Sequence, residues 1–266
     1  MQLASFPRPV ETDDICPIHH VRKVVSPWKK GPKEPFCPVC QQEQNQKELR
    51  QAGLKMLDNQ KRGFLTDKEH KELVRDKNVF KNSFDNFRQD TPKEREVFQQ
   101  VRHIAGEYLK YPNKQFNTLL TGTPGGGKTH LAWGMLKAIN DNAEPAQKCL
   151  FLNFSNALTI IKSGFGKLNP KWTQETVTNL ALEADVLVLD DLGTESAMGR
   201  STGPTQWVSD MLYDILEGQK RVIATSNLSL DEIQRIYDPK LVSRLLRGSR
   251  GHIVSFDGVE DERLSM

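Results

Sequence analysis

The chain has 266 residues and a mass of 30.2 kDa, a length that predicts one large domain or a medium domain with a small one. Hydrophobic residues make up 37% of the sequence and charged residues 27%. This supplies a core but leaves part of the chain as solvated helix or linker. With 37 Lys and Arg against 34 Asp and Glu, the formal net charge is only +3, which excludes a nucleic-acid binder that works by overall charge alone.

The sequence also bears on cellular location. It begins MQLASFPRPVETDD, with prolines and acidic residues where a signal peptide has a basic end and an apolar run. No stretch approaches the ~18 consecutive apolar residues of a membrane-spanning helix. We therefore expect a cytoplasmic protein of a bacterial host with no membrane partner. Thiols stay reduced in that compartment, so that clustered cysteines favour a metal over a disulfide.

Four residues near the N-terminus have the spacing of a zinc site. The segment CPIHH provides Cys16 and His19, and the segment CPVC provides Cys37 and Cys40. Two ligands separated by two residues can reach one tetrahedral ion from a tight turn, and Zn²⁺ suits thiolate and imidazole. We expect a structural zinc ion on these four residues, with His20 as the alternative to His19. A reduced, partly buried set of cysteines is one alternative; a redox Cys-x-x-Cys fits less well, because no strand precedes Cys37.

The next region is predicted to be helical. Residues 41–90 are polar with only patchy helical periodicity, which is typical of a solvated helical linker that shares its apolar side with a partner. The pattern changes at TPKE, where Thr91 has the position of an N-cap, Pro92 lies in the first turn and Glu94 is three residues after the cap. A helix is therefore predicted from this point through Tyr108.

A phosphate-binding loop is predicted near the middle of the chain. Residues 116–121 form a short apolar strand, GTPGGGKT follows, and HLAWGML continues as a helix. This order is that of a P-loop, in which backbone N–H groups and the helix N-terminus hold phosphate oxygens. Lys128 is expected to pair with the β- and γ-phosphates of ATP, and Thr129 to ligate Mg²⁺. The residues expected to bind the nucleotide are Thr123, Gly125, Gly126, Gly127, Lys128, Thr129, His130 and Asp190.

Two further strands carry polar residues at their ends. Residues 184–193 contain the continuous apolar run VLVL, which predicts a strand that is buried on both faces of a parallel sheet, and this run ends in two acids. Asp190 is expected to hold Mg²⁺, and Asp191 to orient or deprotonate the attacking water. Residues 221–225 predict a third strand, after which Asn227 is placed to hydrogen-bond the γ-phosphate or the water. Thr225 is a second candidate for that role.

These segments together resemble the AAA+ ATPases of the DnaC/DnaI helicase-loader group. The similarity covers about residues 95–256 and rests on GTPGGGKTHLA, LVLDDLGTE and IATSNLS. It implies an α/β fold with a parallel sheet and helices on both faces, and Mg²⁺-dependent ATP hydrolysis. The cysteine module is similar to that of loaders of the DnaI and phage type. The expected regions are 1–45 as a zinc-binding module that contacts a helicase, 46–94 as a helical linker and 95–266 as the ATPase domain.

The resemblance also implies an arginine finger that acts on a neighbouring subunit. The sequence SRLL points to Arg244, with Arg247 as the alternative. A guanidinium would neutralise charge on the γ-phosphate of the neighbour, so hydrolysis would require a homo-oligomer, either hexameric or helical. Few residues follow Phe256, which leaves no room for a lid domain and favours a phage-encoded protein. Arg263 is a candidate for part of the role of the missing lid.

A DNA-binding insertion is implied between a predicted strand at residues 148–154 and the strand that ends in Asp190, because initiator-type AAA+ proteins have an extra helical segment there. Three lysines and two aromatic residues in this segment offer charge and stacking surfaces for single-stranded nucleic acid. The alternative is an ordinary helix and loop with solvated lysines. The residues concerned are Lys162, Lys167 and Lys171, with Phe165 and Trp172.

The leading hypothesis is an ATP-dependent loader of a replicative helicase. It would bind a hexameric DnaB-type helicase through residues 1–90 and help to place it on single-stranded DNA during replication initiation. One alternative is a transposase-helper ATPase of the IstB type, which shares the ATPase core and acts on duplex DNA. The other is a non-hydrolysing, nucleotide-dependent adaptor, an alternative that remains because Asp191 stands where AAA+ proteins often have Glu.

Overall fold

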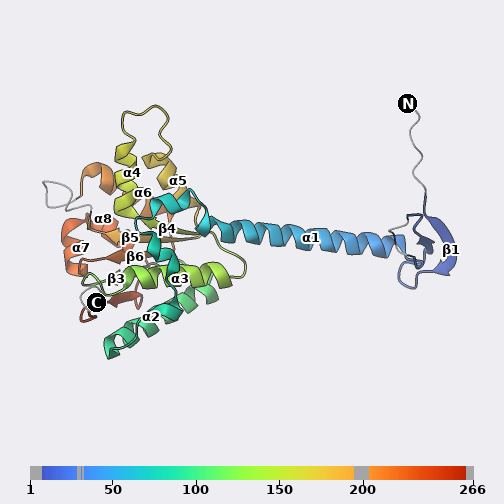
Figure 1. Ribbon diagram of the computed structural model, residues 1–266, viewed down its shortest axis with the longest axis horizontal. Helices are drawn as coiled ribbons and strands as arrows, with labels where there is room; N and C mark the ends of the chain where they lie inside the picture. The colour runs from blue at the N-terminus through green and yellow to red at the C-terminus, as the bar shows by residue number, and fades with distance from the viewer. Residues whose placement is uncertain (1–7, 29–30, 32, 195–203, 262–266) are drawn as a thin grey trace. The chain divides into compact units, whose positions relative to one another are not determined.

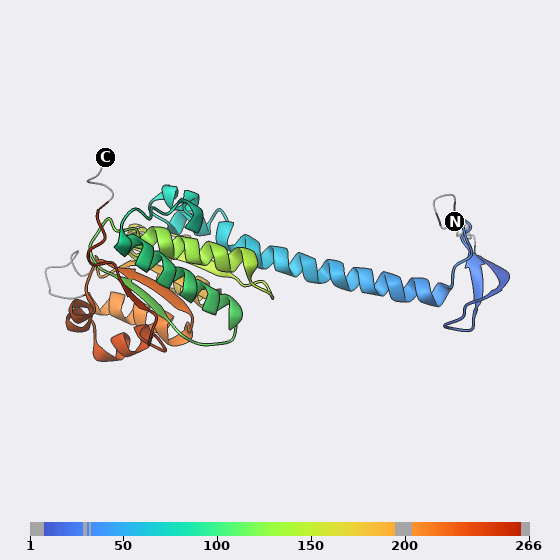
Figure 2. The same cartoon turned by 90° about the horizontal axis from the view of Figure 1, so that it is seen from below.

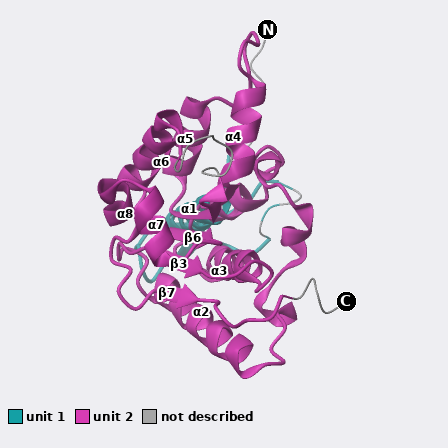
Figure 3. Cartoon of the chain, turned by 90° about the vertical axis from the view of Figure 1, so that its left-hand side faces the viewer, with its two compact units in different colours: residues 1–57 teal, residues 58–266 magenta. Residues whose placement is uncertain are grey.

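The computed structural model describes residues 8–28, 31, 33–194 and 204–261. Residues 1–57 and 58–266 form separate compact units (Figure 3). Among the described residues, none of the helices combines the length and the apolar content that a bilayer-crossing segment needs. Arg263, considered above for a lid-like role, falls outside the described residues.

The first unit is a small antiparallel module followed by a long helix. Strand β1 (Val10–Ile15) pairs with β2 (Arg22–Val25), and a single bridge joins Val24 to Phe36. Helix α1 (Pro38–Gly63) begins at the second pair of cysteines and runs past the end of the unit. Every residue of α1 is exposed or half-buried, as expected of a solvated helix.

Residues 64–90 differ from the continuous helical linker that the sequence suggested. They form four short 3₁₀ turns: η1 (Phe64–Thr66), η2 (His70–Leu73), η3 (Lys77–Lys81) and η4 (Phe84–Asn86). Apolar side chains of this segment lie in the cores of the second unit. Their spacing is irregular, which explains why the segment forms short turns instead of one amphipathic helix. The buried residues of this segment are Leu65, Leu73, Val74, Val79 and Phe87.

Helix α2 (Pro92–Lys110) begins where the capping pattern predicted. Thr91 Oγ1 accepts a hydrogen bond of 3.2 Å from the backbone N–H of Glu94, and the Glu94 carboxylate accepts one of 2.8 Å from the N–H of Thr91. This capping box satisfies two backbone donors that the first turn would otherwise leave unpaired. The predicted helix start is therefore confirmed.

The second unit is built on a five-stranded parallel sheet with the order β4-β5-β6-β3-β7 (Figure 1). Strand β6 lies between β3 and β5, so segments distant in sequence meet at the carboxyl edge of the sheet. The strands are β3 (Thr118–Thr121), β4 (Cys149–Asn153), β5 (Val186–Leu192), β6 (Val222–Ser226) and β7 (Ile253–Ser255).

Helices cover both faces of this sheet, as predicted. On one face, α2 lies beside α3 (Figure 2). Helices α4 to α8 pack on the other face. Along β5, Val186 and Val188 belong to the first core and Leu187 and Leu189 to the second, which explains the uninterrupted apolar run. The helices are α3 (Lys128–Asn142), α4 (Phe154–Ser163), α5 (Gln174–Glu183), α6 (Gln206–Gly218), α7 (Leu230–Ile236) and α8 (Pro239–Leu245).

Candidate nucleotide and metal sites

The glycine-rich loop connects the end of β3 to the first turn of α3. Gly127 is the N-cap residue of α3 and has a φ of +83°, a conformation that glycine adopts at little cost. A Cβ atom at this position would lie 2.6 Å from the ring of Phe87. Gly122 has a φ of +123° at the start of the loop. The loop therefore needs glycine both for its backbone shape and for the close approach of Phe87.

Lys128 is buried in this loop, with only 6% of its surface exposed. Its Nζ donates hydrogen bonds of 2.7 Å to the carbonyl oxygens of Gly122 and Thr123. The ammonium group is thus held beneath the loop, on the side from which helix α3 begins. A positive charge and the N–H groups of a helix start converge here, which is the arrangement that holds phosphate oxygens.

Asp190 is the centre of a buried hydrogen-bond cluster. Its Oδ1 accepts hydrogen bonds of 2.8 Å from the hydroxyls of Thr129 and Thr225, and its Oδ2 accepts one of 3.0 Å from Asn153 Nδ2. Burial raises the pKa of Asp190 above its ordinary value, and these three donors act in the opposite direction. Residues from α3, β4, β5 and β6 therefore meet at one carboxylate.

Asp191 follows in a distorted part of β5. It has a φ of +66°, and the register between β5 and β6 shifts between Leu189 and Leu192. The N–H of Asp191 donates to Thr225 Oγ1 at 2.9 Å, and Asn227 Nδ2 donates to Asp191 Oδ1 at 3.3 Å. This bulge turns Asp191 away from the regular alternation of the strand and toward the residue expected to sense the γ-phosphate.

The environment of Asp191 also includes a residue that the sequence analysis did not identify. Burial and the neighbouring charge of Asp190 raise the pKa of Asp191, whereas the positive charge of Arg75 acts to lower it. Arg75 directly follows Leu73 and Val74, which are both buried. The sequence around Arg75 does not indicate that it lies near Asp191, because Arg75 is in an irregular segment about 115 residues before that acid.

Asn153 was also missed, although a signal for it existed. It ends the apolar strand β4 in the same way that Asp190 ends β5, and the two residues are register partners. A polar residue at the carboxyl end of a buried parallel strand is a candidate for a site residue. Applying that rule to every apolar run would have selected Asn153.

His130 faces the segment before α2. Its Nε2 lies 2.9 Å from the carbonyl oxygen of Ser83, and its ring meets that of Phe87 edge to face at 5.3 Å. The first turn of α3 is thereby joined to the turns that precede α2. The remaining loop residues expected to bind the nucleotide, Thr123, Gly125 and Gly126, lie between β3 and α3.

Arg244 and Arg247 share one acidic partner. Arg244 Nε and Arg247 Nη2 both donate to Glu217 Oε2 at the end of α6. The guanidinium of Arg244 also lies 4.7 Å from the centre of the Tyr213 ring. The structure thus places both candidate finger residues at the surface formed by α6 and α8, rather than beside the P-loop of their own chain.

The three lysines considered for DNA binding lie on α4 and the loop after it. Lys171 Nζ is 3.0 Å from Glu72 Oε1, and the indole N–H of the adjacent Trp172 donates to Glu72 Oε2 at 2.8 Å. Lys162 lies 5.8 Å from the ring centre of Trp207, and Lys167 is exposed. Glu72 therefore pairs with two of the residues considered for DNA binding, Lys171 and Trp172.

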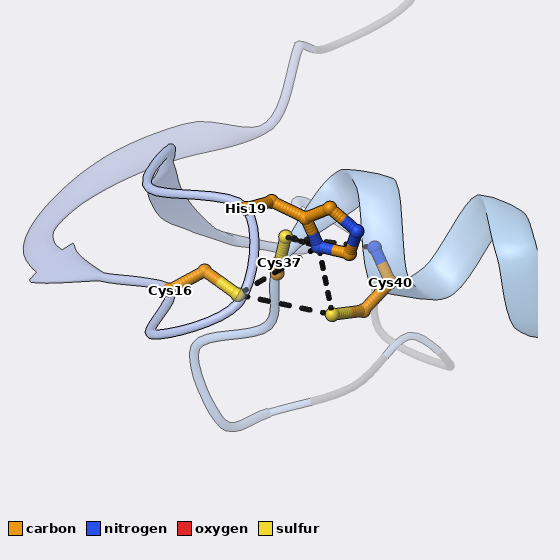
Figure 4. Close-up of side chains that lie close together, drawn as sticks. All are labelled: Cys16, His19, Cys37 and Cys40. Atoms are coloured by element: carbon orange, nitrogen blue, oxygen red, sulfur yellow. Dashed lines mark hydrogen bonds between the residues drawn. The ribbon is translucent and has the colours of Figure 1, made fainter.

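In the first unit, four predicted metal ligands converge (Figure 4). Their ligand atoms all lie within 4.8 Å of one another, and His19 Nδ1 is 3.3 Å from Cys40 Sγ and 3.7 Å from Cys37 Sγ. Ligands of a tetrahedral zinc ion, at about 2.0–2.3 Å from the metal, are separated by roughly 3.3–3.8 Å. The donor set of three sulfurs and one imidazole nitrogen, completed by Cys16, therefore fits Zn²⁺.

The surroundings of this cluster favour metal binding. Hydrogen bonds from the backbone of His19 and Ile18 lower the pKa of Cys16 to about 6, so its thiolate is present at neutral pH. Burial raises the pKa of Cys40 to about 11; a cation would offset this. His19 Nε2 lies 3.3 Å from Glu43 Oε1, which orients Nδ1 toward the sulfurs. His20 is exposed, so the structure brings His19 rather than His20 into the cluster.

Comparison with solved structures shows the fold. DnaI gives a TM-score of 0.51 at 16% identity, covering 69% of this chain and 95% of that one. DnaA from Aquifex aeolicus, bound to AMPPCP, gives 0.50 at 18% identity, covering 69% and 52%. The DnaC helicase loader gives 0.48 at 22% identity, covering 68% and 99%. The chain thus spans about half the length of the DnaA structure that it matches.

Comparison by sequence shows the family. No curated protein matches the chain. The profile of the IstB-like ATP binding protein family matches residues 61–259, a range that begins near the end of α1 and includes the P-loop, both acids and Asn227. The protein has the P-loop fold of AAA+ ATPases, as its sequence predicted, and it belongs to the family of IstB-like ATP-binding proteins.

Proposed function

We propose that the protein binds and hydrolyses ATP and uses this cycle to load a replicative helicase on single-stranded DNA. The observation that carries the ATPase activity is the convergence of Lys128, Thr129, Asp190, Asp191 and Asn227 at the carboxyl edge of the sheet. The name of the matching family and the AMPPCP in the related DnaA structure support an adenine nucleotide as the ligand.

Each side chain has a defined task in this proposal. Lys128 neutralises the β- and γ-phosphates, and Thr129 and Asp190 would hold Mg²⁺, which supplies charge neutralisation at the phosphates. Asp191 accepts the proton of the attacking water, and Asn227 keeps Asp191 and the water in position. The raised pKa of Asp191, caused by burial and by Asp190, makes it a stronger base than an exposed carboxylate.

Arg244 is proposed to act on a neighbouring subunit. It lies at the surface of α6 and α8, where it pairs with the half-exposed Glu217, so a second subunit could exchange this partner for a γ-phosphate. Hydrolysis would then require a homo-oligomer, either hexameric or helical. This requirement would couple ATP turnover to assembly.

The N-terminal unit is proposed to contact the helicase. Its cluster of Cys16, His19, Cys37 and Cys40 suits a structural zinc ion, because four protein ligands leave no open position. We assign residues 1–45 to this module and the following part of α1 to the linker. Residues 64–94, which the sequence placed in the linker, belong with residues 95–266 to the compact ATPase unit. A phage-encoded protein that acts in the bacterial cytoplasm fits this organisation.

The second candidate function is that of a transposition helper. The observation that favours it is the family match itself, because residues 61–259 fit the IstB-like profile. In that case the protein would bind and deform duplex DNA and would have no helicase partner. The cysteine module in the N-terminal unit supports the loader instead, because it is similar to the module of loaders of the DnaI and phage type.

ATP turnover by the purified chain tests the enzymatic part of the proposal. Lys128→Ala and Asp191→Asn are expected to abolish DNA-stimulated hydrolysis, and Arg244→Ala to abolish it while nucleotide binding remains. Restored turnover on mixing Arg244→Ala with Asp191→Asn would support the finger in trans. Unchanged turnover in Lys128→Ala and Asp191→Asn would instead favour the non-hydrolysing adaptor.

Capture of a replicative helicase tests the biological part. The full chain is expected to retain a DnaB-type hexamer, and Cys37→Ser with Cys40→Ser is expected to lose this partner while it retains ATP binding. Preference for duplex over single strands in a salt titration, with no helicase capture, would favour the transposition helper.

A further inference from the structure

The carboxyl end of α2 carries a hollow that the nucleotide site does not use. Its volume is about 720 Å³. Six of the residues that line it have charged or aromatic side chains: Arg102, His103, Glu107, Lys110, Tyr111 and Lys114. All of them come from the last turns of α2 and the short segment that follows it.

This hollow and the P-loop lie at opposite edges of the parallel sheet. Lys114 lies a few residues before the start of β3, and His252, which pairs with Glu107, directly precedes β7. In a parallel sheet the strands all start at the same edge. The hollow therefore lies at the amino edge of the sheet, whereas the P-loop and Asp190 lie at the carboxyl edge.

The charges around the hollow are mostly positive. Arg102, Lys110 and Lys114 are cationic at neutral pH. Burial acts to raise the pKa of Glu107, but hydrogen bonds from Lys114 and His252 outweigh it and keep this pKa below its ordinary value. The one carboxylate that lines the hollow is thus already paired and offsets only part of the positive charge.

The helix dipole explains only part of this arrangement. Cations are favoured in the last turn of a helix, which accounts for Lys110. Lys114 lies outside the helix, and its backbone N–H is tied to the carbonyl oxygen of Tyr111 at 3.0 Å. This turn brings both lysines to the same aromatic ring.

Tyr111 offers a surface for a planar ligand. Its side chain is 42% exposed, and Lys110 Nζ and Lys114 Nζ lie 5.2 and 5.6 Å from the ring centre. Its own backbone N–H is held by the carbonyl oxygen of Glu107 at 2.9 Å. An exposed aromatic ring next to cations is the combination on which single-stranded nucleic acids stack a base and rest their phosphates. Both ammonium groups lie over the ring, so a base that stacks there would take the place of one of them while its phosphates pair with the lysines.

We propose that this hollow is a binding site for single-stranded nucleic acid, in which Arg102, Lys110 and Lys114 contact backbone phosphates and Tyr111 stacks on a base. The site is separate from the lysines of the α4 loop. It goes beyond the proposed ATPase function and does not depend on it.

The salt dependence of strand binding by the full chain without nucleotide tests the phosphate contacts. The probe is a labelled oligo(dT) strand, and the variant combines Arg102→Gln, Lys110→Gln and Lys114→Gln. Each phosphate contact contributes about 0.7 to the slope of log K against log salt for single strands, so the slope is expected to fall by roughly 2. Lys114→Gln retains a donor for Glu107, and the thermal unfolding curve is expected to remain unchanged.

A charge-matched control combines Lys47→Gln, Arg50→Gln and Lys55→Gln on the exposed helix α1. It is expected to keep the slope of the wild-type chain. Equal slopes in this control and in the triple variant of the hollow would overturn the proposal. An equal fall in slope for a duplex probe would show a backbone site without strand selectivity, and would overturn the single-strand assignment.

Substitution of Tyr111 tests the stacking contact separately. Tyr111→Ala is expected to weaken oligo(dT) binding roughly 5- to 150-fold at every salt concentration, with the slope unchanged, because stacking does not release counterions. Tyr111→Phe is expected to bind like the wild-type chain. Wild-type affinity in Tyr111→Ala would refute the stacked base and with it the proposal.

Discussion

The hydroxyl of Thr129 donates a hydrogen bond of 2.8 Å to Asp190 Oδ1, which joins the start of α3 to the end of β5 across 61 residues of sequence. Both oxygens are hard ligands of the kind that Mg²⁺ prefers. The bond between them therefore brings together the two side chains that would hold the cation, Thr129 through its hydroxyl oxygen and Asp190 through its carboxylate. The two residues belong to separate elements of the fold, α3 and β5, and the packing of these elements sets the distance between them.

Substitution of Thr129 should uncouple nucleotide binding from Mg²⁺. Thr129→Val removes the ligand oxygen, and we expect the tightening of AMPPCP binding by Mg²⁺ to disappear, a loss of about 1.5–3 kcal/mol. Thr129→Ser retains the hydroxyl and is expected to retain most of the effect. Calorimetric titration with and without Mg²⁺ measures it, and full Mg²⁺ dependence in Thr129→Val would contradict the assignment.

Thr225 should stabilise the fold through the same cluster. Its hydroxyl donates to Asp190 and accepts from the N–H of Asp191, and the residue is 2% exposed. Thr225→Val leaves a buried donor unpaired and removes one donor from the Asp190 carboxylate, which should cost about 1–3 kcal/mol of unfolding free energy. Thr225→Ser keeps both bonds and should cost less. Urea unfolding compares the two, and equal midpoints would count against this role.

Much of the nucleotide site could be predicted because its residues follow strong local patterns. The run ending in Asp190 is apolar at every position since β5 is covered by both cores, and the loop before Lys128 needs glycine for its backbone. The capping box of Thr91 and Glu94 is equally local. Each of these signals depends on neighbours in sequence, which a single sequence displays directly.

The contributions of Arg75 and Glu72 could not be predicted in this way. Both lie in the irregular turns between α1 and α2, where no periodicity relates a residue to the element it contacts. Glu72 contacts Lys171, which is 99 residues later in the sequence. The residues around each of them contain no pattern that predicts this contact. The small strands β1 and β2 were missed for a related reason, because their mostly exposed residues show no alternation.

Glu72 should restrain DNA binding by the loop after α4. Its carboxylate accepts hydrogen bonds from Trp172 and Lys171, which keep its pKa below the ordinary value. Glu72→Gln removes the competing charge, so single-strand affinity at low salt should rise roughly two- to fivefold, since an exposed ion pair is worth about 0.2–1 kcal/mol. Glu175→Gln, in the first turn of α5, makes the same change in net charge and should have less effect.

Fluorescence anisotropy with a labelled single strand measures this difference. Lys171→Ala should weaken binding in the wild-type background, and adding Glu72→Gln to it should restore nothing. Identical affinities for Glu72→Gln and Glu175→Gln would show that Lys171 and Trp172 do not meet the strand.

Metal analysis should find about one zinc ion per chain, because Cys16, His19, Cys37 and Cys40 form one closed set of ligands. Removal by a chelator should unfold the first unit, since a metal of this kind contributes to folding directly. The second unit has its own two cores and should keep its thermal transition. Loss of both transitions on chelation would contradict the separation of the two units.

Glu43 should tune this zinc site without binding the metal. It lies 3.3 Å from His19 Nε2 and so fixes the tautomer in which Nδ1 faces the three sulfurs. Loss of such an outer partner typically weakens metal binding about 10- to 100-fold. Glu43→Ala should therefore lose zinc to a competing chelator at a correspondingly lower concentration. Glu48→Ala, further along α1, should match the wild-type chain, and equal zinc affinities in the two variants would show that His19 is held by the sulfurs alone.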